Sequence, residues 1–190
     1  MKYARSVFFD GINQKGFSLL ETLVAMVIFA VSMLGYIGMQ SRGVQLNLES
    51  DQREQAIRMV EFLVNAINTN RDARGCYQTI GGEHTTQYAG TGNTENFTCL
   101  GSGVIETQAQ ANNDMDLWDD LLKGENQGGA MINARGCVSL DGATGDMTVT
   151  VVWQGLVATE ASGSACAIDL YTGDTRRVLS FTISFADLEA

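Results

Sequence analysis

The hydrophobic and polar positions divide this sequence into segments of different character. A short polar start is followed by an apolar run from Phe17 to Met39, in which Glu21 is the only charged residue. From Ala56 to Ile67 apolar side chains recur every three or four positions, which is typical of one face of an α-helix. Alternating apolar and polar residues toward the C-terminus indicate β-strands. The pattern therefore predicts a long N-terminal helix followed by a domain of mixed helix and sheet.

The apolar run is long enough to cross a membrane. As an α-helix, about 23 residues would extend roughly 35 Å, and the hydrocarbon core of a bilayer is about 30 Å thick. Lys2, Arg5 and Lys15 precede the run, with only Asp10 to oppose them. Because positively charged flanks remain on the cytoplasmic side, the sequence predicts a cytoplasmic start and an exported remainder.

Two ordinary targeting segments are alternatives for this run. A secretory signal peptide would be cleaved near Ala30-Val31-Ser32, which has a small-x-small pattern, but the apolar residues continue past that site. A signal anchor would explain the length and the basic flank, but it gives no role to Glu21. A carboxylate in the centre of a membrane helix costs about 3 kcal/mol, so Glu21 indicates a function that requires a positively charged partner.

A second helical segment follows the apolar run. Its apolar face consists of Ala56, Ile57, Val60, Leu63, Val64 and Ile67. This spacing predicts an amphipathic helix that packs on a sheet, and nothing in it suggests a cofactor. Between the two segments, Gly35, Gly38 and Gly43 are weak helix formers, so they mark either a place where the helix bends or a face where helices pack closely.

The C-terminal part predicts a polar loop, a short helix and a small sheet. Gly, Thr, Asn and Gln dominate the segment from Tyr77 to Asn113, which we expect to be an extended loop. A helix is expected from Asp114 to Lys123, with one side formed by Leu117, Trp118, Leu121 and Leu122. Strands are expected over 136–140, 147–154 and 177–185, with a hairpin turn over 141–146. Together these elements predict an α+β fold in which the long helix lies on an antiparallel sheet.

Composition narrows the possible functions and the disulfide pattern. The net charge of −10 argues against a nucleic-acid binder with a basic footprint. The chain has no proline, so another feature must hold its loops. The four cysteines of an exported chain predict two disulfides; four allow three connectivities, and the spacing favours Cys76 with Cys99 and Cys137 with Cys166. A zinc site is the weaker alternative, because the sequence has no CxxC pair and one histidine.

The sequence offers little for catalysis, and no cofactor is expected. His84 lies in a Gly- and Thr-rich stretch, where a solvated loop residue is the simpler interpretation, and no G-x-S-x-G motif is present. Calcium is a weak alternative use for two groups of acids, Asp114, Asp116, Asp119 and Asp120 in the short helix and Asp141 and Asp146 in the turn. Helix capping and turn formation explain both groups.

The residues Gly16-Phe17-Ser18-Leu19-Leu20-Glu21, with the basic start and the apolar run, resemble the processing site of type IV prepilins and type II secretion pseudopilins. In that family a prepilin peptidase cleaves after the glycine and methylates the new amino terminus. The resemblance implies cleavage between Gly16 and Phe17 and N-methylation of Phe17. It also implies that Glu21, the fifth mature residue, pairs with the amino terminus of a neighbouring subunit. Two charges that are each costly in hydrocarbon are tolerated as a pair, so this pairing would favour one register between subunits.

The whole layout is similar to PilV-type minor pilins of the type IV pilus. The implied organisation is a leader over 1–16, a transmembrane and filament-core helix over 17–40, an amphipathic helix over 41–70 and a periplasmic head over 71–190. The resemblance implies a non-enzymatic, inner-membrane subunit that assembles with other minor pilins and the major pilin, primes pilus assembly, and ends in the fibre or at its tip. The alternatives are a minor pseudopilin of type II secretion and, from a different class, a membrane-anchored periplasmic enzyme or binding protein.

Overall fold

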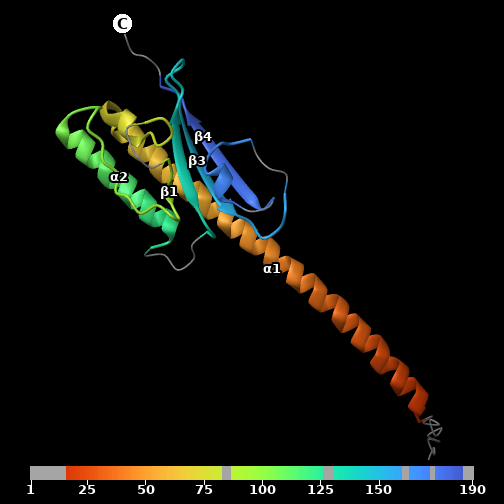
Figure 1. The fold of residues 1–190 in the computed structure, drawn as a ribbon. Coiled ribbons are helices and arrows are strands. Elements are labelled where there is room, and N and C mark those ends of the chain that lie inside the picture. The colour runs from red at the N-terminus through yellow and green to blue at the C-terminus, as the bar shows by residue number, and fades with distance from the viewer. Residues whose placement is uncertain (1–15, 83–86, 126–130, 160–162, 172–173, 186–190) are drawn as a thin grey trace, which may run out of the picture. The chain divides into compact units, whose positions relative to one another are not determined.

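The computed structural model describes residues 16–82, 87–125, 131–159, 163–171 and 174–185 (Figure 1). The helices are α1 (Leu19–Thr69) and α2 (Ile105–Lys123), with two short 3₁₀-helices, η1 (Arg71–Tyr77) and η2 (Ile168–Leu170). The strands are β1 (Ala89–Gly90), β2 (Arg135–Leu140), β3 (Met147–Gln154) and β4 (Arg176–Ile183). This α+β, pilin-like architecture confirms the predicted fold class. Residues 1–15 of the predicted leader lie outside the described residues.

The chain forms two compact units, which divide within α1. The first unit ends at Val44, and the second begins at Gln45 and contains all the other helices and strands. We call the second the head unit. The C-terminal part of α1 is therefore built into the head unit, while its N-terminal part belongs to the first unit.

The four strands form one antiparallel sheet in the order β1-β2-β3-β4. The predicted hairpin between β2 and β3 is confirmed, and Asp141 organises its turn. The Asp141 N–H donates to the Asp146 carbonyl at 2.9 Å, and its carboxylate accepts the Ala143 N–H at 2.8 Å. Gly145 has a φ of +74°, a left-handed conformation that glycine adopts without strain.

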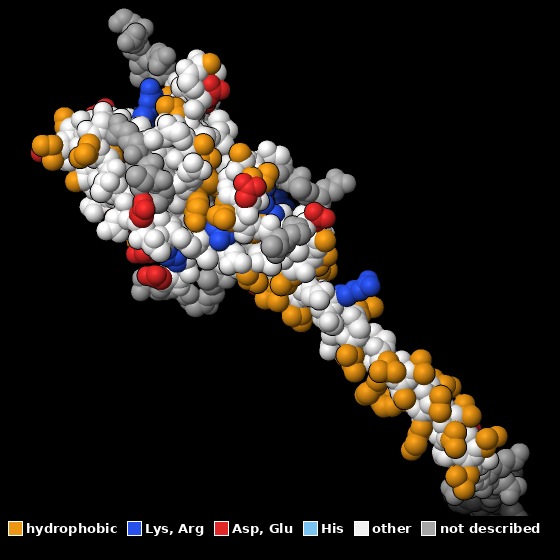
Figure 2. Space-filling view, viewed as in Figure 1, with side chains coloured by type: hydrophobic (Ala, Val, Ile, Leu, Met, Phe, Trp, Pro, Cys, Tyr) orange, Lys and Arg blue, Asp and Glu red, His pale blue; other side chains and the backbone are white. Residues whose placement is uncertain are grey.

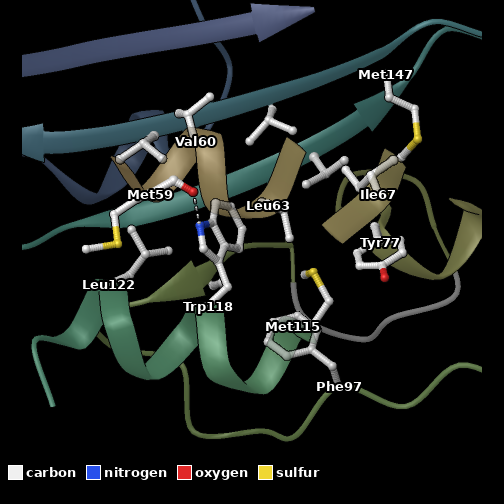
Figure 3. Close-up of a cluster of buried hydrophobic side chains, with 14 of the residues drawn as sticks. Met59, Val60, Leu63, Ile67, Tyr77, Phe97, Met115, Trp118, Leu122 and Met147 are labelled. Atoms are coloured by element: carbon white, nitrogen blue, oxygen red, sulfur yellow. Dashed lines mark hydrogen bonds between the residues drawn. The ribbon is translucent and has the colours of Figure 1, made fainter. Parts of the chain in front are cut away.

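One face of α1 supplies much of the core of the head unit (Figure 3). The predicted positions Ala56, Val60, Leu63 and Ile67 are buried. The prediction for Ile57 is wrong: its side chain is 40% exposed, and Met59 is buried instead. A helix turns about 100° per residue, so a buried face centred on positions 56, 60, 63 and 67 includes 59 and carries 57 to the side.

Helix α2 begins at Ile105, earlier than the predicted start at Asp114, so the end of the expected loop is helical. Its first half is mostly Thr, Gln and Asn, and Ala111 is its one buried residue before Met115, so apolar periodicity gives almost no signal there. The prediction for Leu117 is also wrong. Leu117 is 49% exposed, whereas Trp118 and Leu122 are buried as expected.

Trp118 joins α2 to both α1 and the sheet. Its indole N–H donates to the backbone carbonyl of Met59 at 3.0 Å, a contact that Figure 3 shows. The ring also lies directly against the backbone of β2, because a β-carbon built on Gly136 would be 2.2 Å from Cη2 of Trp118. The long helix, the short helix and the sheet therefore meet at one fully buried side chain.

One of the two disulfides and Asp119 of α2 hold the segment between η1 and α2. The disulfides are Cys76–Cys99 and Cys137–Cys166, with Cα–Cα distances of 5.3 and 5.7 Å, which are the pairs that the sequence spacing favours. Among the aspartates, Asp119 accepts the Gly90 N–H at 2.6 Å and the Asn93 amide at 2.9 Å. The polar segment is therefore tied to α2 as well as closed by a disulfide.

A further link connects η1 to α2. The Tyr77 hydroxyl donates to Asp114 at 2.7 Å and accepts a hydrogen bond from the Asn70 amide at 3.2 Å. Burial, followed by the hydrogen bond to Asp114, raises the pKa of the Tyr77 phenol well above its ordinary value. The phenol is therefore neutral at physiological pH and remains a hydrogen-bond donor.

Candidate processing and assembly site

Gly16 and Phe17 lie immediately before α1, outside its hydrogen-bonded backbone. The Ser18 carbonyl accepts the N–H groups of Glu21 and Thr22 at 3.0 and 3.2 Å, so the first helical turn closes just after the Gly16–Phe17 peptide bond. Phe17 is 80% exposed. Because this peptide bond takes no part in the helix, a protease can bind it in an extended conformation without unwinding α1.

Nothing in the described packing requires glycine at position 16. A β-carbon built there would meet no atom within 4 Å, and the residue does not have a left-handed φ. A larger side chain would therefore fit this position in the isolated chain.

Glu21 lies in the first turn of α1, where the helix dipole favours a carboxylate. Its side chain is exposed, and among the described residues no cation forms an ion pair with it. The next charged residue along the chain is Arg42, which is roughly 30 Å away along a continuous helix. A cation that pairs with Glu21 in the described conformation must therefore come from outside this helix.

The N-terminal part of α1 exposes apolar side chains on all sides. Among the described residues, α1 is the one helix long and apolar enough to cross a membrane, and none of its most apolar window is buried. Figure 2 shows these hydrophobic side chains along the helix. The exposed large apolar residues before Gln40 are Phe17, Leu19, Leu20, Leu23, Val24, Met26, Val27, Ile28, Phe29, Val31, Met33, Leu34, Tyr36, Ile37 and Met39. A helix that is apolar all round requires a membrane or neighbouring helices to cover it.

Two hydroxyl groups within this apolar part bond to the helix itself. Thr22 donates to the Leu19 carbonyl at 2.9 Å, and Ser32 donates to the Ile28 carbonyl at 2.8 Å. Such bonds allow a hydroxyl to enter hydrocarbon without losing its hydrogen bond. Glu21 is therefore the one charged group in a segment that otherwise suits an apolar environment.

The helix is continuous through Gly35, Gly38 and Gly43. A β-carbon at any of the three would meet no atom within 4 Å, so none is required by contacts among the described residues. The sequence predicts that these glycines either let the helix bend on assembly or allow close packing with another helix. Both roles involve a neighbouring molecule, so both stay predictions.

The other residues that the sequence suggested for chemistry do not form a site in the described residues. Each cysteine is in a disulfide, so none is a thiolate that could bind zinc. His84 lies outside the described residues. Within the described ranges, no group of three or more His, Cys, Asp or Glu residues is placed to hold a metal ion.

Three of the four acids of α2 that could have bound calcium have structural partners. Asp114 binds Tyr77, Asp116 accepts the Phe97 N–H at 3.0 Å, and Asp119 binds the loop and Lys123. Sequence reasoning missed the contacts with Tyr77, Phe97 and Gly90, because these partners lie between 19 and 37 residues away and no local pattern pairs them. The only sequence signal was the concentration of aspartates between positions 114 and 120.

Residues 12–37 match the prokaryotic N-terminal methylation motif. The chain carries a prepilin-type processing motif. It covers Gly16, Phe17 and Glu21 and most of the apolar part of α1. No curated protein and no solved structure matches this chain significantly. The motif, the pilin-like fold and the exposed apolar helix support a structural subunit of pilin or pseudopilin type, anchored through its N-terminal helix.

Proposed function

We propose that this protein is a minor pilin, a structural subunit of the type IV pilus that takes part in priming pilus assembly. The methylation motif carries the proposal, since it lies where the chain enters an exposed apolar helix. The proposed partners in the assembly are other minor pilins and the major pilin. The subunit is inserted once in the inner membrane with a periplasmic head, and it then enters the fibre or its tip.

The first step is cleavage by a prepilin peptidase between Gly16 and Phe17, followed by methylation of the Phe17 amine. The exposed, non-helical peptide bond supports this step. Since the fold itself accepts a side chain at position 16, we assign the choice of glycine to the active site of the peptidase. Removal of 16 of the 190 residues takes away three basic groups and one acidic group, so the net charge changes from −10 to −12.

The second step is docking through Glu21. After cleavage, the cationic amino terminus of one subunit pairs with Glu21 of its neighbour. The pairing stabilises assembly because each charge alone is costly in an apolar environment, while the pair is tolerated. The absence of another cation near Glu21 on α1 supports an intersubunit partner.

Mass spectrometry of the mature protein from its native membrane tests the proposal. We expect an amino terminus at N-methylated Phe17. The variant Gly16→Val should accumulate uncleaved, whereas Gly11→Val, a glycine in the same leader, should be processed as usual. A terminus at Met1 or near Met33 in the wild-type protein would refute prepilin processing.

A minor pseudopilin of type II secretion would share the same motif and processing. Deletion of the gene separates the two functions: loss of twitching motility with intact protein secretion is expected for a minor pilin. Loss of secretion with intact twitching would assign the subunit to type II secretion.

A further inference from the structure

Two apolar side chains of the head unit are exposed, although the sequence pattern predicts both on buried faces. Ile57 of α1 is 40% exposed, and Leu117 of α2 is 49% exposed. Other members of the same two apolar stripes, Leu63 and Trp118, are fully buried. A neighbouring molecule that covers Ile57 and Leu117 would account for the apolar surface that the single chain leaves exposed.

An apolar groove surrounds Ile57. It has a volume of about 360 Å³ and is lined by Ile57, Val60, Glu61 and Val64 of α1 and by residues 179–181 of β4. A polar pocket of about 460 Å³ adjoins the groove, because Leu179 lines both. Arg53 of α1 lines this pocket, four positions before Ile57. The two hollows therefore form one path along α1.

Charged side chains lie at the two ends of this path. Arg177 in the polar pocket is paired with Glu49 at 2.9 Å, whereas Arg53 is exposed and has no ion pair among the described residues. Glu61 is also exposed, and no ion pair of the described ranges includes it. Four positions make about one helical turn. The path therefore offers a carboxylate at Glu61, an apolar centre at Ile57 and a cation at Arg53, one turn apart.

The outer face of α2 carries groups of complementary chemistry at the same spacing. Asn113, Leu117 and Asp120 are three or four positions apart, so they lie on one side of the helix, away from the buried Trp118. Asn113 and Leu117 are exposed and Asp120 is half-buried. No ion pair among the described residues includes Asp120. This face presents an amide, an apolar side chain and a carboxylate in turn.

The groove and the outer face of α2 suit two copies that have the same orientation. The Asn70 amide donates to the Thr107 carbonyl at 2.8 Å, and the Trp118 indole donates to the Met59 carbonyl at 3.0 Å, so α2 runs antiparallel to α1. Met59 and Ile57 are about 160° apart around α1, so α2 and the groove lie on different sides of it (Figure 1). A second copy pointing the same way can therefore lay its α2 antiparallel along the groove.

We propose that the occupant of the groove is α2 of a second copy, with α1 of both copies pointing in the same direction. Leu117 of the second copy enters the groove beside Ile57. The flanking pairs are Asn113 with Glu61 and Asp120 with Arg53. The amide donates to the Glu61 carboxylate, and the Asp120 carboxylate pairs with Arg53, so polar complementarity fixes the register around an apolar centre.

This contact keeps the apolar parts of both copies in one membrane. Within one chain Trp118 lies beside Met59, so Leu117 lies beside about position 60. To lie opposite Ile57 of its neighbour, the second copy is shifted along α1 by three positions, roughly 4.5 Å. The apolar run of about 23 residues exceeds the hydrocarbon core by roughly 5 Å, so both copies can span the same bilayer. This step rests on the proposed membrane insertion.

The contact joins two different surfaces, so it is not a two-fold dimer. Each copy uses the groove on one side of α1 and the outer face of α2 on another side. A third copy can therefore add in the same way, as in a filament or a ring. This asymmetry gives the cross-linking test its specificity.

Cysteine cross-linking between two differently tagged copies of the full chain, co-expressed in the native membrane, tests the contact. One copy carries Glu61→Cys and the other carries Asn113→Cys. The four native cysteines are in disulfides, so the introduced cysteines supply the free thiols. Facing side chains of helices packed 8–10 Å apart lie within about the reach of a disulfide. We expect mild oxidation to link the two tags, and at least tenfold less product when either variant is expressed alone.

The matched control replaces Asn113→Cys with Glu106→Cys. Glu106 is exposed on the same side of α2, seven positions earlier, so it would lie roughly 10 Å from the thiol at position 61 along the helix. We expect at least tenfold less linked product from this control than from the Asn113→Cys pair.

A charge exchange tests the register. Arg53→Glu in the Glu61→Cys copy should lower the linked product by about fivefold, because Asp120 then faces a like charge. Adding Asp120→Arg to the Asn113→Cys copy should restore it. As a control, Arg53→Glu placed instead in the Asn113→Cys copy should have no effect, because that arginine lies outside the linked contact.

The proposal is overturned if the mixed copies give no more product than the Glu106→Cys control, or if either variant alone gives as much. Failure of the charge exchange to restore the product, or a link to a different protein in place of the second tag, would overturn it as well. Uncleaved Gly16→Val chains should form the same link, because all the contact residues lie in the head unit. Failure of processing at Gly16 and failure of this contact are therefore separate results.

Discussion

At the scale of single residues, Gly136 is the position where an added methyl group should disturb the fold most directly. Its β-carbon would lie 2.2 and 2.6 Å from two atoms of the buried Trp118 ring and 2.9 Å from Leu122. Because Trp118 is held by the Met59 carbonyl, the ring has little freedom to move. We expect Gly136→Ala to lower the free energy of unfolding of the head unit by about 2 kcal/mol.

Denaturant unfolding followed by tryptophan fluorescence measures this effect, since Trp118 and Trp153 are both buried in the head unit. The matched control is Gly142→Ala, where a β-carbon meets no atom within 4 Å. The control should unfold within about 0.5 kcal/mol of the wild type. Equal unfolding midpoints for the two variants would contradict the close packing of Trp118 on β2.

Sequence periodicity located the buried face of α1 but not every residue on it. It placed Ala56, Leu63 and Ile67 correctly because a single apolar stripe contains them. It failed at Ile57 and Met59, since both are apolar and the choice between them depends on where α2 and β4 lie. Residues at the margin of a buried face are buried or exposed according to the elements that pack against the helix, and the local sequence pattern does not contain this information.

At the scale of elements, Asp119 of α2 holds the segment around β1 in place. Its buried carboxylate accepts the Gly90 N–H and the Asn93 amide and pairs with Lys123. We expect Asp119→Ala to destabilise the head unit by about 3 kcal/mol, because two buried donors lose their acceptor. Hydrogen exchange should show faster exchange of the Gly90 amide and its neighbours up to Glu95.

The control for this prediction is Asp120→Ala, the adjacent acid on the same helix. Asp120 is half-buried, and its side chain makes none of the hydrogen bonds described for the loop. Its loss should leave the exchange of residues 89–95 unchanged. If the two variants gave the same exchange pattern, the loop would not depend on Asp119.

The elements themselves were predictable to different degrees for physical reasons. The β2–β3 hairpin and β4 were predicted because alternating side chains and the Asp141 turn are local features. The first half of α2 was not predicted, because its Gln- and Asn-rich residues bury almost nothing. The buried residues that fix the position of α2, such as Met115 and Trp118, lie in its second half. The apolar groove between α1 and β4 had no sequence signal, because residues more than 100 positions apart line it.

At the scale of the whole molecule, the two parts of α1 are suited to different environments. Before Val44 its side chains are exposed and almost entirely apolar, whereas after Gln45 one face is buried in the head unit. The sequence showed this division, because the absence of charge from Thr22 to Met39 and the later amphipathic stripe are both local. The proposed processing at Gly16 and docking through Glu21 would concern only the first part, so the folding of the head unit should not depend on them.

The variant Glu21→Ala tests that separation. The substitution leaves the Gly16–Phe17 peptide bond and the start of α1 in place, so cleavage and methylation at Phe17 should continue. Incorporation into the assembled fibre should fall by about tenfold or more, because the amino terminus of the neighbouring subunit loses its counter-charge in an apolar environment. Quantifying the processed subunit in membrane and sheared-fibre fractions measures both steps. Glu54→Ala is the matched control, an exposed acid on the same helix that pairs with Arg58, and it should assemble normally. If Glu21→Ala were incorporated as well as this control, charge pairing at Glu21 would not drive assembly.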